Sequence, residues 1–324
     1  MRSALVLGAT GGIGGAVAAN FLRRGWDVKA LARDPASARR RWQQDPSPIW
    51  LKGDAMSRAD VIGAAQGVSV IAHAVNPPGY KDWDKFLLPM LDNTIEAAKT
   101  AGARIVLPGN VYNFGPDAFD SPDENAPQNP LTRKGKIRVE MERRLKEASD
   151  TGAKTLIVRA GDFFGPHAGG SWFSQGLIQP GKPVKVVRNP GKAGVGHQWA
   201  YLPDLAETMA VLLEREDRLA DFAVFHFDGF WDADGQQMGE AIRIATGDPS
   251  IPIKPFPWWL IRLASPFVTT FRELIEMRYL WDVPLRISNK RLVSELGYEP
   301  RTNIVEAVRE TLRGLKCLPA EGRF

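Results

Sequence analysis

Short apolar runs alternate with amphipathic segments along the first half of the chain. Six runs of four or five residues read as buried strands: Ala4–Leu7, Asp27–Leu31, Ile49–Lys52, Val68–Ala72, Arg104–Leu107 and Thr155–Arg159. Apolar residues three and four apart predict helices between them, at Gly12–Arg24, Arg58–Ala65, Trp83–Ala101 and Gly135–Asp150. This alternation predicts an α/β fold, a doubly wound parallel sheet with helices on both faces.

The pattern changes after Arg159. Glycine, proline and tryptophan become frequent through residues 165–199. A helix at Pro203–Glu216 and a strand at Ala223–Phe227 then indicate a return to the sheet. We predict a Rossmann domain in residues 1–165, a return of about residues 200–228 to the sheet, and a smaller substrate-binding lobe mainly in residues 166–324. Ligands of such sheets bind outside the carboxyl ends of the strands, where a lobe closes a cleft.

A glycine-rich turn follows the first strand and opens the first helix. Its sequence is Gly8-Ala9-Thr10-Gly11-Gly12-Ile13-Gly14. Gly8 permits a tight turn, and Gly14 lets the helix pack on the strand. Gly11 and Gly12 let the backbone approach a pyrophosphate, which the free N–H groups and the positive dipole end of the helix attract. The sequence therefore predicts a dinucleotide site on this turn.

Arg33 follows the second strand, where the chain meets the adenosine ribose of such a ligand. An acidic residue there binds the ribose 2′-hydroxyl and selects NAD, whereas an arginine accommodates the 2′-phosphate of NADP. Here Arg33 comes first and Asp34 lies one position further along. We therefore predict NADP as the cofactor, with NAD as the alternative.

Composition excludes several other classes of protein. The net charge is +5, but basic residues mix with acidic ones outside Arg33 and Arg39–Arg41, so no nucleic-acid-binding surface is indicated. The single cysteine, Cys317, excludes a disulfide framework, and the four scattered histidines lack metal-ligand spacing, so we expect no metal site. Charges interrupt the most apolar stretch, Phe256–Trp281, so no membrane segment is predicted. With no secretory segment before the first strand, we expect a cytoplasmic protein.

These motifs resemble the short-chain dehydrogenase/reductase superfamily, in its extended or atypical branch of NAD(P)-dependent epimerase/dehydratase-like proteins. The resemblance covers essentially the whole chain. Further matching segments are Gly53-Asp54, Ala72-His73-Ala74, Pro203-Asp204-Leu205-Ala206 and Leu296-Gly297-Tyr298-Glu299-Pro300. The resemblance implies cofactor contacts from the glycine turn, including Thr10 and Ile13, and from Asp54, which binds the adenine, with Ala55 beside it. It also implies contacts from Ala74, Val75 and Asn76 to the ribose and phosphates, and from Ala160, Gly161, Asp162 and Phe163 to the nicotinamide.

The catalytic residues depart from that family's pattern. Asn110 stands where members carry a serine or threonine. Lys136 fits the family lysine, which holds the nicotinamide ribose, but Thr132 or Leu131 stands where the partner tyrosine belongs. A threonine hydroxyl cannot act as that acid/base, because its pKa is far too high.

Three explanations of the missing phenol stay open. Tyr112 supplies it from a new direction, the substrate needs no protein acid, or the chain binds NADP without turnover. His197 is a further candidate general acid, since its ordinary pKa lies near physiological pH. With Asp162, Trp172, Trp199 and Tyr201, it is a candidate for the substrate side.

The function predicted from these residues is that of an NAD(P)-dependent oxidoreductase or epimerase/dehydratase-like enzyme. Its substrate is an unidentified small carbonyl, hydroxyl or nucleotide-sugar compound. The alternative is a redox-sensing regulator that binds NADP(H) without chemistry. The resemblance also implies a homodimer paired through the helices at Trp83–Ala101 and Gly135–Asp150.

Overall fold

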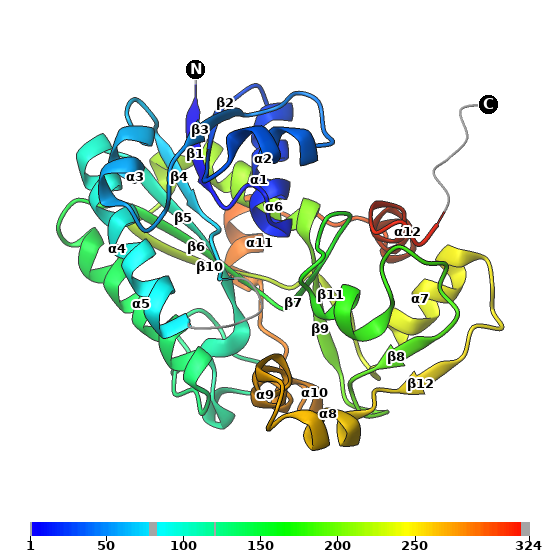
Figure 1. Cartoon of the computed structure of the whole chain (residues 1–324). Coiled ribbons are helices and arrows are strands. Elements are labelled where there is room, and N and C mark those ends of the chain that lie inside the picture. The colour runs from blue at the N-terminus through cyan, green and yellow to red at the C-terminus, as the bar shows by residue number, and fades with distance from the viewer. Residues whose placement is uncertain (1, 78–82, 120, 319–324) are drawn as a thin grey trace.

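A parallel sheet of seven strands forms the centre of the molecule (Figure 1). The computed structural model describes residues 2–77, 83–119 and 121–318. The strand order is β10-β6-β5-β4-β1-β2-β3, and every neighbouring pair is parallel. The strands are β1 (Ser3–Leu7), β2 (Asp27–Ala32), β3 (Ile49–Lys52), β4 (Val70–His73), β5 (Arg104–Asn110), β6 (Thr155–Ala160) and β10 (Phe222–Phe227). The chain order reverses between β1 and β4, which is the switch point where such sheets bind ligands.

Helices cover both faces of this sheet, because the side chains of each strand alternate between two apolar layers. Leu5 and Leu7 of β1 face one layer, whereas Ala4 and Val6 face the other. The first layer is completed by α3 (Arg58–Ala64), α4 (Trp83–Ala101) and α5 (Arg133–Ser149). The second is completed by α1 (Gly12–Arg23), α6 (Leu202–Glu214) and α11 (Lys290–Leu296). Figure 1 shows the two sets on opposite sides of the sheet.

The remaining elements pack beyond the carboxyl ends of β5 and β6. They form a three-stranded sheet in the order β11-β9-β7 and a two-stranded sheet of β12 and β8. These strands are β7 (Asp162–Phe164), β8 (Val187–Asn189), β9 (His197–Tyr201), β11 (Phe230–Asp232) and β12 (Ile253–Pro255). The helices around them are α7 (Gln237–Thr246), α8 (Trp258–Ala264), α9 (Thr269–Glu276), α10 (Tyr279–Asp282) and α12 (Ile304–Gly314).

The predicted parallel sheet and Rossmann-like fold are confirmed, with shifts at element ends. Strand β5 runs three residues past its predicted end at Leu107, because Pro108, Gly109 and Asn110 continue the register with β6. The sequence analysis missed helix α2 (Pro35–Arg41), although Asp34 caps it and Pro35 suits its first turn. The division into domains at residue 165 stays a prediction.

Candidate functional site

The glycine turn after β1 has the backbone geometry that phosphate binding requires. Gly8 has a φ of +90°, and a Cβ there would lie 2.5 Å from the Ala74 carbonyl oxygen. A Cβ on Gly14 would lie 2.2 Å from the Gly8 carbonyl oxygen, so both positions need glycine to form the turn. Gly11 differs, because a Cβ there would meet only the Gly8 oxygen, at 3.4 Å.

The packing of the turn therefore does not explain why position 11 is a glycine. It is the N-cap of α1, has no side-chain cap, and precedes a first helical turn without acidic residues. The N–H groups of that turn have no partner within the helix and carry partial positive charge. This arrangement fits the pyrophosphate of a dinucleotide.

The ends of β2 and β3 present two polar residues at the same edge of the sheet. Arg33 is exposed, and no carboxylate pairs with it in the described part of the chain. Its neighbour Asp34 is already engaged, because its Oδ1 accepts a hydrogen bond of 2.9 Å from the Ser37 N–H. Asp54 is half-buried, and its Oδ1 accepts from the Met56 N–H at 3.0 Å, which leaves Oδ2 for a ligand.

Helix α5 carries a row of charged side chains on its buried side. Lys134, Arg138 and Glu142 are four residues apart and therefore share one face. The Arg138 guanidinium lies over the Trp83 ring, 4.8 Å from its centre. Burial, followed by the charge of Arg138, lowers the pKa of His73 to about 3. Since His73 ends β4, this face of α5 turns toward the carboxyl edge of the sheet.

The residues predicted for the tyrosine–lysine pair lie elsewhere on α5. Thr132 is its N-cap, and its hydroxyl accepts from the Gly135 N–H at 3.0 Å. Leu131 is 77% exposed. Lys136 is exposed and makes no side-chain hydrogen bond among the described residues, because it lies about 200° around the helix from Lys134. The role of Lys136 stays a prediction that no contact supports.

Lys134 connects α5 to the elements beyond the sheet. Its buried ammonium donates to Glu276 Oε2 at 2.7 Å and to Glu273. Glu276 Oε1 also accepts from the Lys134 N–H at 3.0 Å, at the start of α5. Burial opposes the charge of Glu276, but its hydrogen bonds with Lys134 outweigh this and lower its pKa.

Asn110 and Tyr112 lie together at the end of β5. Asn110 Oδ1 accepts from the Tyr112 N–H at 3.0 Å and so caps a short 3-10 helix over Val111–Asn113. Tyr112 is 7% exposed and packs in the same apolar layer as Ile137 of α5. Its role as a relocated phenol stays a prediction, and its burial in this layer weighs against it.

Asp162 and His197 meet where the small sheet joins the end of β6. Asp162 begins β7 and His197 begins β9. The Asp162 Oδ2 and His197 Nε2 atoms are 2.9 Å apart. The adjoining Ala160 and Gly161 pack tightly, since a Cβ on Gly161 would lie 2.2 Å from the Gln198 carbonyl oxygen. These contacts bring the predicted nicotinamide-flanking segment against β9.

A pocket opens beside this pair, between β8, β9 and the start of α7. His197, Trp199 and Trp281 form its aromatic wall, and Arg188 and Asp232 add charge. Two of the predicted substrate-side residues, His197 and Trp199, therefore line one pocket. Tyr201 does not line it, because its hydroxyl donates to Glu310 of α12. Trp281, which the sequence analysis did not single out, carries no sequence signal beyond its residue type.

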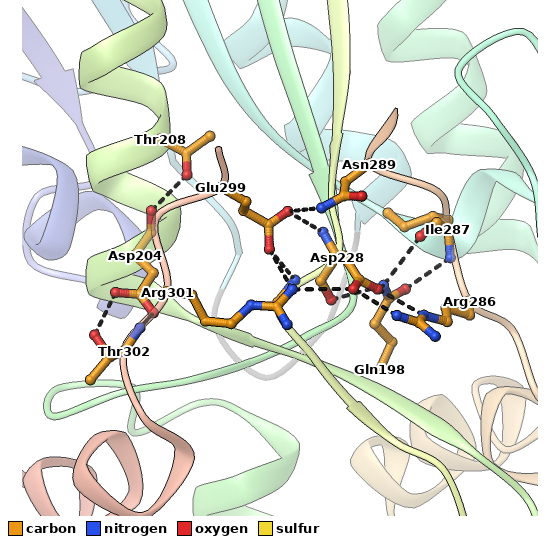
Figure 2. Close-up of polar contacts among 11 residues, drawn as sticks. Gln198, Asp204, Thr208, Asp228, Arg286, Ile287, Asn289, Glu299, Arg301 and Thr302 are labelled. Atoms are coloured by element: carbon orange, nitrogen blue, oxygen red, sulfur yellow. Dashed lines mark hydrogen bonds and ion pairs between the residues drawn. The ribbon is translucent and has the colours of Figure 1, made fainter. Parts of the chain in front are cut away.

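The motif residues Asp204 and Glu299 have a structural role (Figure 2). Glu299 accepts from the N–H groups of Asp228 and Gly229, at 2.8 and 2.9 Å. Asp204 accepts from both the N–H and the hydroxyl of Thr302, at 2.7 Å each. These bonds fix the segment after α11 to the end of β10 and to α6.

The Figure 2 network also occupies two arginines. Arg286 forms a two-point pair with Asp228, at 2.9 and 2.8 Å, and Arg301 binds both Asp228 and Glu299. Neither guanidinium is therefore free of carboxylate partners. Among residues 2–77, 83–119 and 121–318, no cluster of His, Cys, Asp or Glu could hold a metal ion. No helix in the same ranges is long and apolar enough to cross a membrane.

Comparison with solved structures establishes the fold. UDP-glucose 4-epimerase from Stenotrophomonas maltophila, with bound NAD and formylated UDP-arabinopyranose, is 16% identical over 98% of both chains, with a TM-score of 0.75. UDP-glucose 4-epimerase from Bifidobacterium longum, in complex with NAD+ and UDP, is 15% identical over 98% of both chains, with a TM-score of 0.71. UDP-N-acetylglucosamine 4-epimerase from Bacillus cereus is 14% identical over 98% of this chain and 99% of that one, with a TM-score of 0.71.

Sequence comparison identifies the family. No curated protein sequence matches the chain. A family model described as NAD(P)H-binding matches residues 8–170, a span that begins at the glycine turn and ends beyond β7. The fold of the extended short-chain dehydrogenase/reductase type, inferred from the motifs, agrees with this match. Because this family model matches half of the chain, the chain belongs to the NAD(P)H-binding family.

Proposed function

We propose that this protein is an NADP-dependent enzyme of the epimerase/dehydratase type that acts on a carbonyl or hydroxyl group of a small molecule. The observation that carries this proposal is the contact of Asp162 with His197, which links the segment after β6 to the pocket that His197 lines. A protein that only binds a dinucleotide needs the glycine turn. It does not need the Asp162–His197 contact between the dinucleotide site and a separate pocket.

The residues at the sheet edge would hold the dinucleotide. The first turn of α1 would bind the pyrophosphate, Asp54 the adenine, and Arg33 the 2′-phosphate of NADP. Ala74 and Val75 lie against Gly8, and Asn76 is exposed beside them, so this segment would face the ribose and phosphates. When bound, the reduced dinucleotide would supply a hydride.

Arg138 suits the ribose-binding role better than Lys136. It shares the buried face of α5 with Lys134 and Glu142 and acts electrostatically on His73 at the end of β4. The Trp83 ring and the Met141 sulfur contact its guanidinium, whose several donors suit ribose hydroxyls. We therefore assign the ribose contact to Arg138.

The reacting carbonyl or hydroxyl group of the substrate would approach the pocket lined by His197, Trp199 and Trp281, which is too small to enclose the whole molecule. The relatives with known ligands bind UDP or a UDP-sugar, which makes nucleotide sugars one class to test. The pocket wall here combines the rings of His197, Trp199 and Trp281 with aliphatic side chains, and Arg286 and Arg301 are paired with carboxylates, so an apolar carbonyl compound is a second class.

A redox-sensing regulator that binds NADP(H) without chemistry is the second candidate. The missing phenol favours it, because Thr132 only caps α5 and Lys134, two residues further on, is held in buried ion pairs with Glu273 and Glu276.

Turnover measurements separate the two candidates. NADPH oxidation is followed with 4-nitrobenzaldehyde, and epimerisation with UDP-glucose, after calorimetry has shown that NADP+ binds. Turnover of either compound supports the enzyme. Tight NADP+ binding with no turnover of any carbonyl or nucleotide-sugar compound tested would favour the regulator.

A further inference from the structure

Both ring nitrogens of His197 face oxygen atoms. Nε2 lies 2.9 Å from Asp162 Oδ2, and Nδ1 lies 3.2 Å from the Leu280 carbonyl oxygen in α10. A backbone carbonyl can only accept a hydrogen bond, and an ionised carboxylate can only accept as well. A neutral imidazole carries a single N–H, so it satisfies one of these oxygens and turns a lone pair toward the other.

The geometry is satisfied only when the pair holds one further proton. That proton lies either on the ring, giving an imidazolium beside a carboxylate, or on Asp162, giving a carboxyl that donates to Nε2. In both forms Nδ1 donates to Leu280. The pair therefore differs from a neutral histidine beside an ionised aspartate by one proton, held between Nε2 and Oδ2.

The packing of the His197 ring fixes its position. His197 stacks on Trp281 with ring centres 3.7 Å apart and an interplanar angle of 5°. Trp199 meets the same ring edge-on, at 5.0 Å. The face of an indole attracts a cation, and a ring held between two tryptophans cannot turn freely. The histidine and aspartate side chains are only 9% and 10% exposed, which keeps water from replacing their contact.

We propose that the Asp162–His197 pair is the proton donor and acceptor of this site, in place of the absent phenol; this rests on the proposed function. His197 lines the pocket, and Asp162 lies in the segment expected beside the nicotinamide. In carbonyl reduction, the pair gives its proton to the substrate oxygen while the carbon takes the hydride from the dinucleotide. The product is an alcohol, and the pair is left as a neutral imidazole beside a carboxylate, which water reprotonates.

Other ionisable groups surround the pair on every side. Asp232 of β11 is the cross-strand neighbour of His197, and its carboxylate accepts from the first N–H groups of α7 at 3.0 Å. Arg188 of β8 lines the same pocket. Tyr279 of α10 lies close enough to Asp162 and to Glu276 of α9 for both carboxylates to raise its pKa.

Tyr279 is the rival donor for the same reaction. Its phenol oxygen is buried beside the Thr132 hydroxyl. Burial, followed by the charge of Asp162, raises the pKa of Tyr279 above its ordinary value. A phenol with a raised pKa gives up its proton less readily near neutral pH.

The first test counts the proton without cofactor or substrate. Ring nitrogens of the uniformly 15N-histidine-labelled protein are observed by NMR near pH 7. We expect both nitrogens of His197 to be protonated or to share a proton with Asp162. In Asp162→Asn, the amide donates to Nε2 and preserves the contact, so His197 becomes a neutral ring protonated at Nδ1. His73 and His226, whose pKa values burial lowers to about 3, are internal references for neutral rings. A wild-type His197 carrying one proton, with Asp162 ionised, would overturn the proposal.

The second test asks whether that proton is used. With NADPH and 4-nitrobenzaldehyde, Asp162→Asn should lower kcat by about 100-fold or more, while NADPH affinity by calorimetry stays within about twofold. An unchanged kcat in Asp162→Asn, or a loss seen with Tyr279→Phe alone, would overturn the proposal. A protonated pair in a protein that turns over no carbonyl compound would also overturn its catalytic role. Failure of the wild-type protein to bind NADP(H) would instead refute the proposed function. The NMR result would remain valid in that case, because it is measured without cofactor.

Discussion

The cofactor edge and the junction beyond it are built from different parts of the chain. At the edge, the proposed phosphate site consists of backbone groups from the contiguous residues Gly8–Gly14. Several of these residues are glycines, so backbone N–H groups rather than side chains would bind the ligand. At the junction, charged and aromatic side chains from distant segments meet, as in Lys134 with Glu276 and Asp162 with His197. Changes at Gly11, where a side chain has room, should therefore alter binding with little effect on folding, whereas changes at the junction should alter stability.

The largest expected effect is at the Lys134 ion pairs. In the Glu273→Gln/Glu276→Gln double variant, Lys134 keeps its buried charge but loses both carboxylates. We expect the free energy of unfolding, measured in urea, to fall by about 3–5 kcal/mol. The triple variant Lys134→Met/Glu273→Gln/Glu276→Gln should cost much less, because it removes the ammonium together with both carboxylates and leaves no buried charge unpaired.

A matched surface variant sharpens this result. Glu147 pairs with Arg143 on the exposed side of α5, where both side chains are more than half exposed. Glu147→Gln should therefore cost less than about 1 kcal/mol. Equal losses in the buried and exposed variants would contradict the assigned role of the junction.

The next effect is at the glycine turn. Gly11→Val should weaken NADP+ binding by about 100-fold, or about 2.7 kcal/mol, because the side chain fills the space that the pyrophosphate needs. Unfolding should change little, since a Cβ at Gly11 meets only one atom, at 3.4 Å. Gly63→Val is the control, because no atom lies within 4 Å of a Cβ there. Calorimetry with unchanged affinity in Gly11→Val would show that the turn is structural only.

Arg33 should determine which dinucleotide binds. Arg33→Ala should remove most of the preference for NADP+ over NAD+, about 1.5–3 kcal/mol, while NAD+ affinity stays constant. Arg23→Ala, in the last turn of α1 at the opposite end from the glycine turn, should change neither affinity. Equal affinity of the wild-type protein for the two dinucleotides would refute the NADP assignment.

The smallest effect separates neutral histidines from the proposed protonated one. Burial lowers the pKa of His73 from 6.5 to about 3, so the folded state keeps the ring neutral while the unfolded chain takes up a proton below pH 6.5. This stability is complete above pH 6.5 and is lost as the pH falls toward 3. His73 should contribute a loss of about 1 kcal/mol between pH 6.5 and 5.5.

Urea unfolding at several pH values measures that contribution. His73→Asn preserves a polar partner for Thr94, which lies 2.8 Å from His73 Nδ1, and should make the dependence on pH shallower by about that amount. An identical pH dependence in wild type and His73→Asn would show that the ring is already charged in the folded protein.

The sequence by itself determined the sheet and the cofactor turn, because both depend on local patterns. Apolar runs, helical spacing and the glycine positions are properties of neighbouring residues. The same local reasoning placed Thr132 and Lys136 as the tyrosine–lysine pair, although the charged face of α5 carries Lys134, Arg138 and Glu142. The four-residue spacing of that row was visible in the sequence, but its orientation toward the sheet was not.

Only the tertiary structure decided which groups surround His197. In the sequence it is a lone histidine in a glycine-rich segment, 35 residues from Asp162 and 83 from Leu280. Its two partners and the Trp281 ring reach it because β7, β9 and α10 pack together beyond the sheet. Local patterns carry no information about which distant side chains such packing will bring into contact, and the protonation of a buried histidine depends on those contacts.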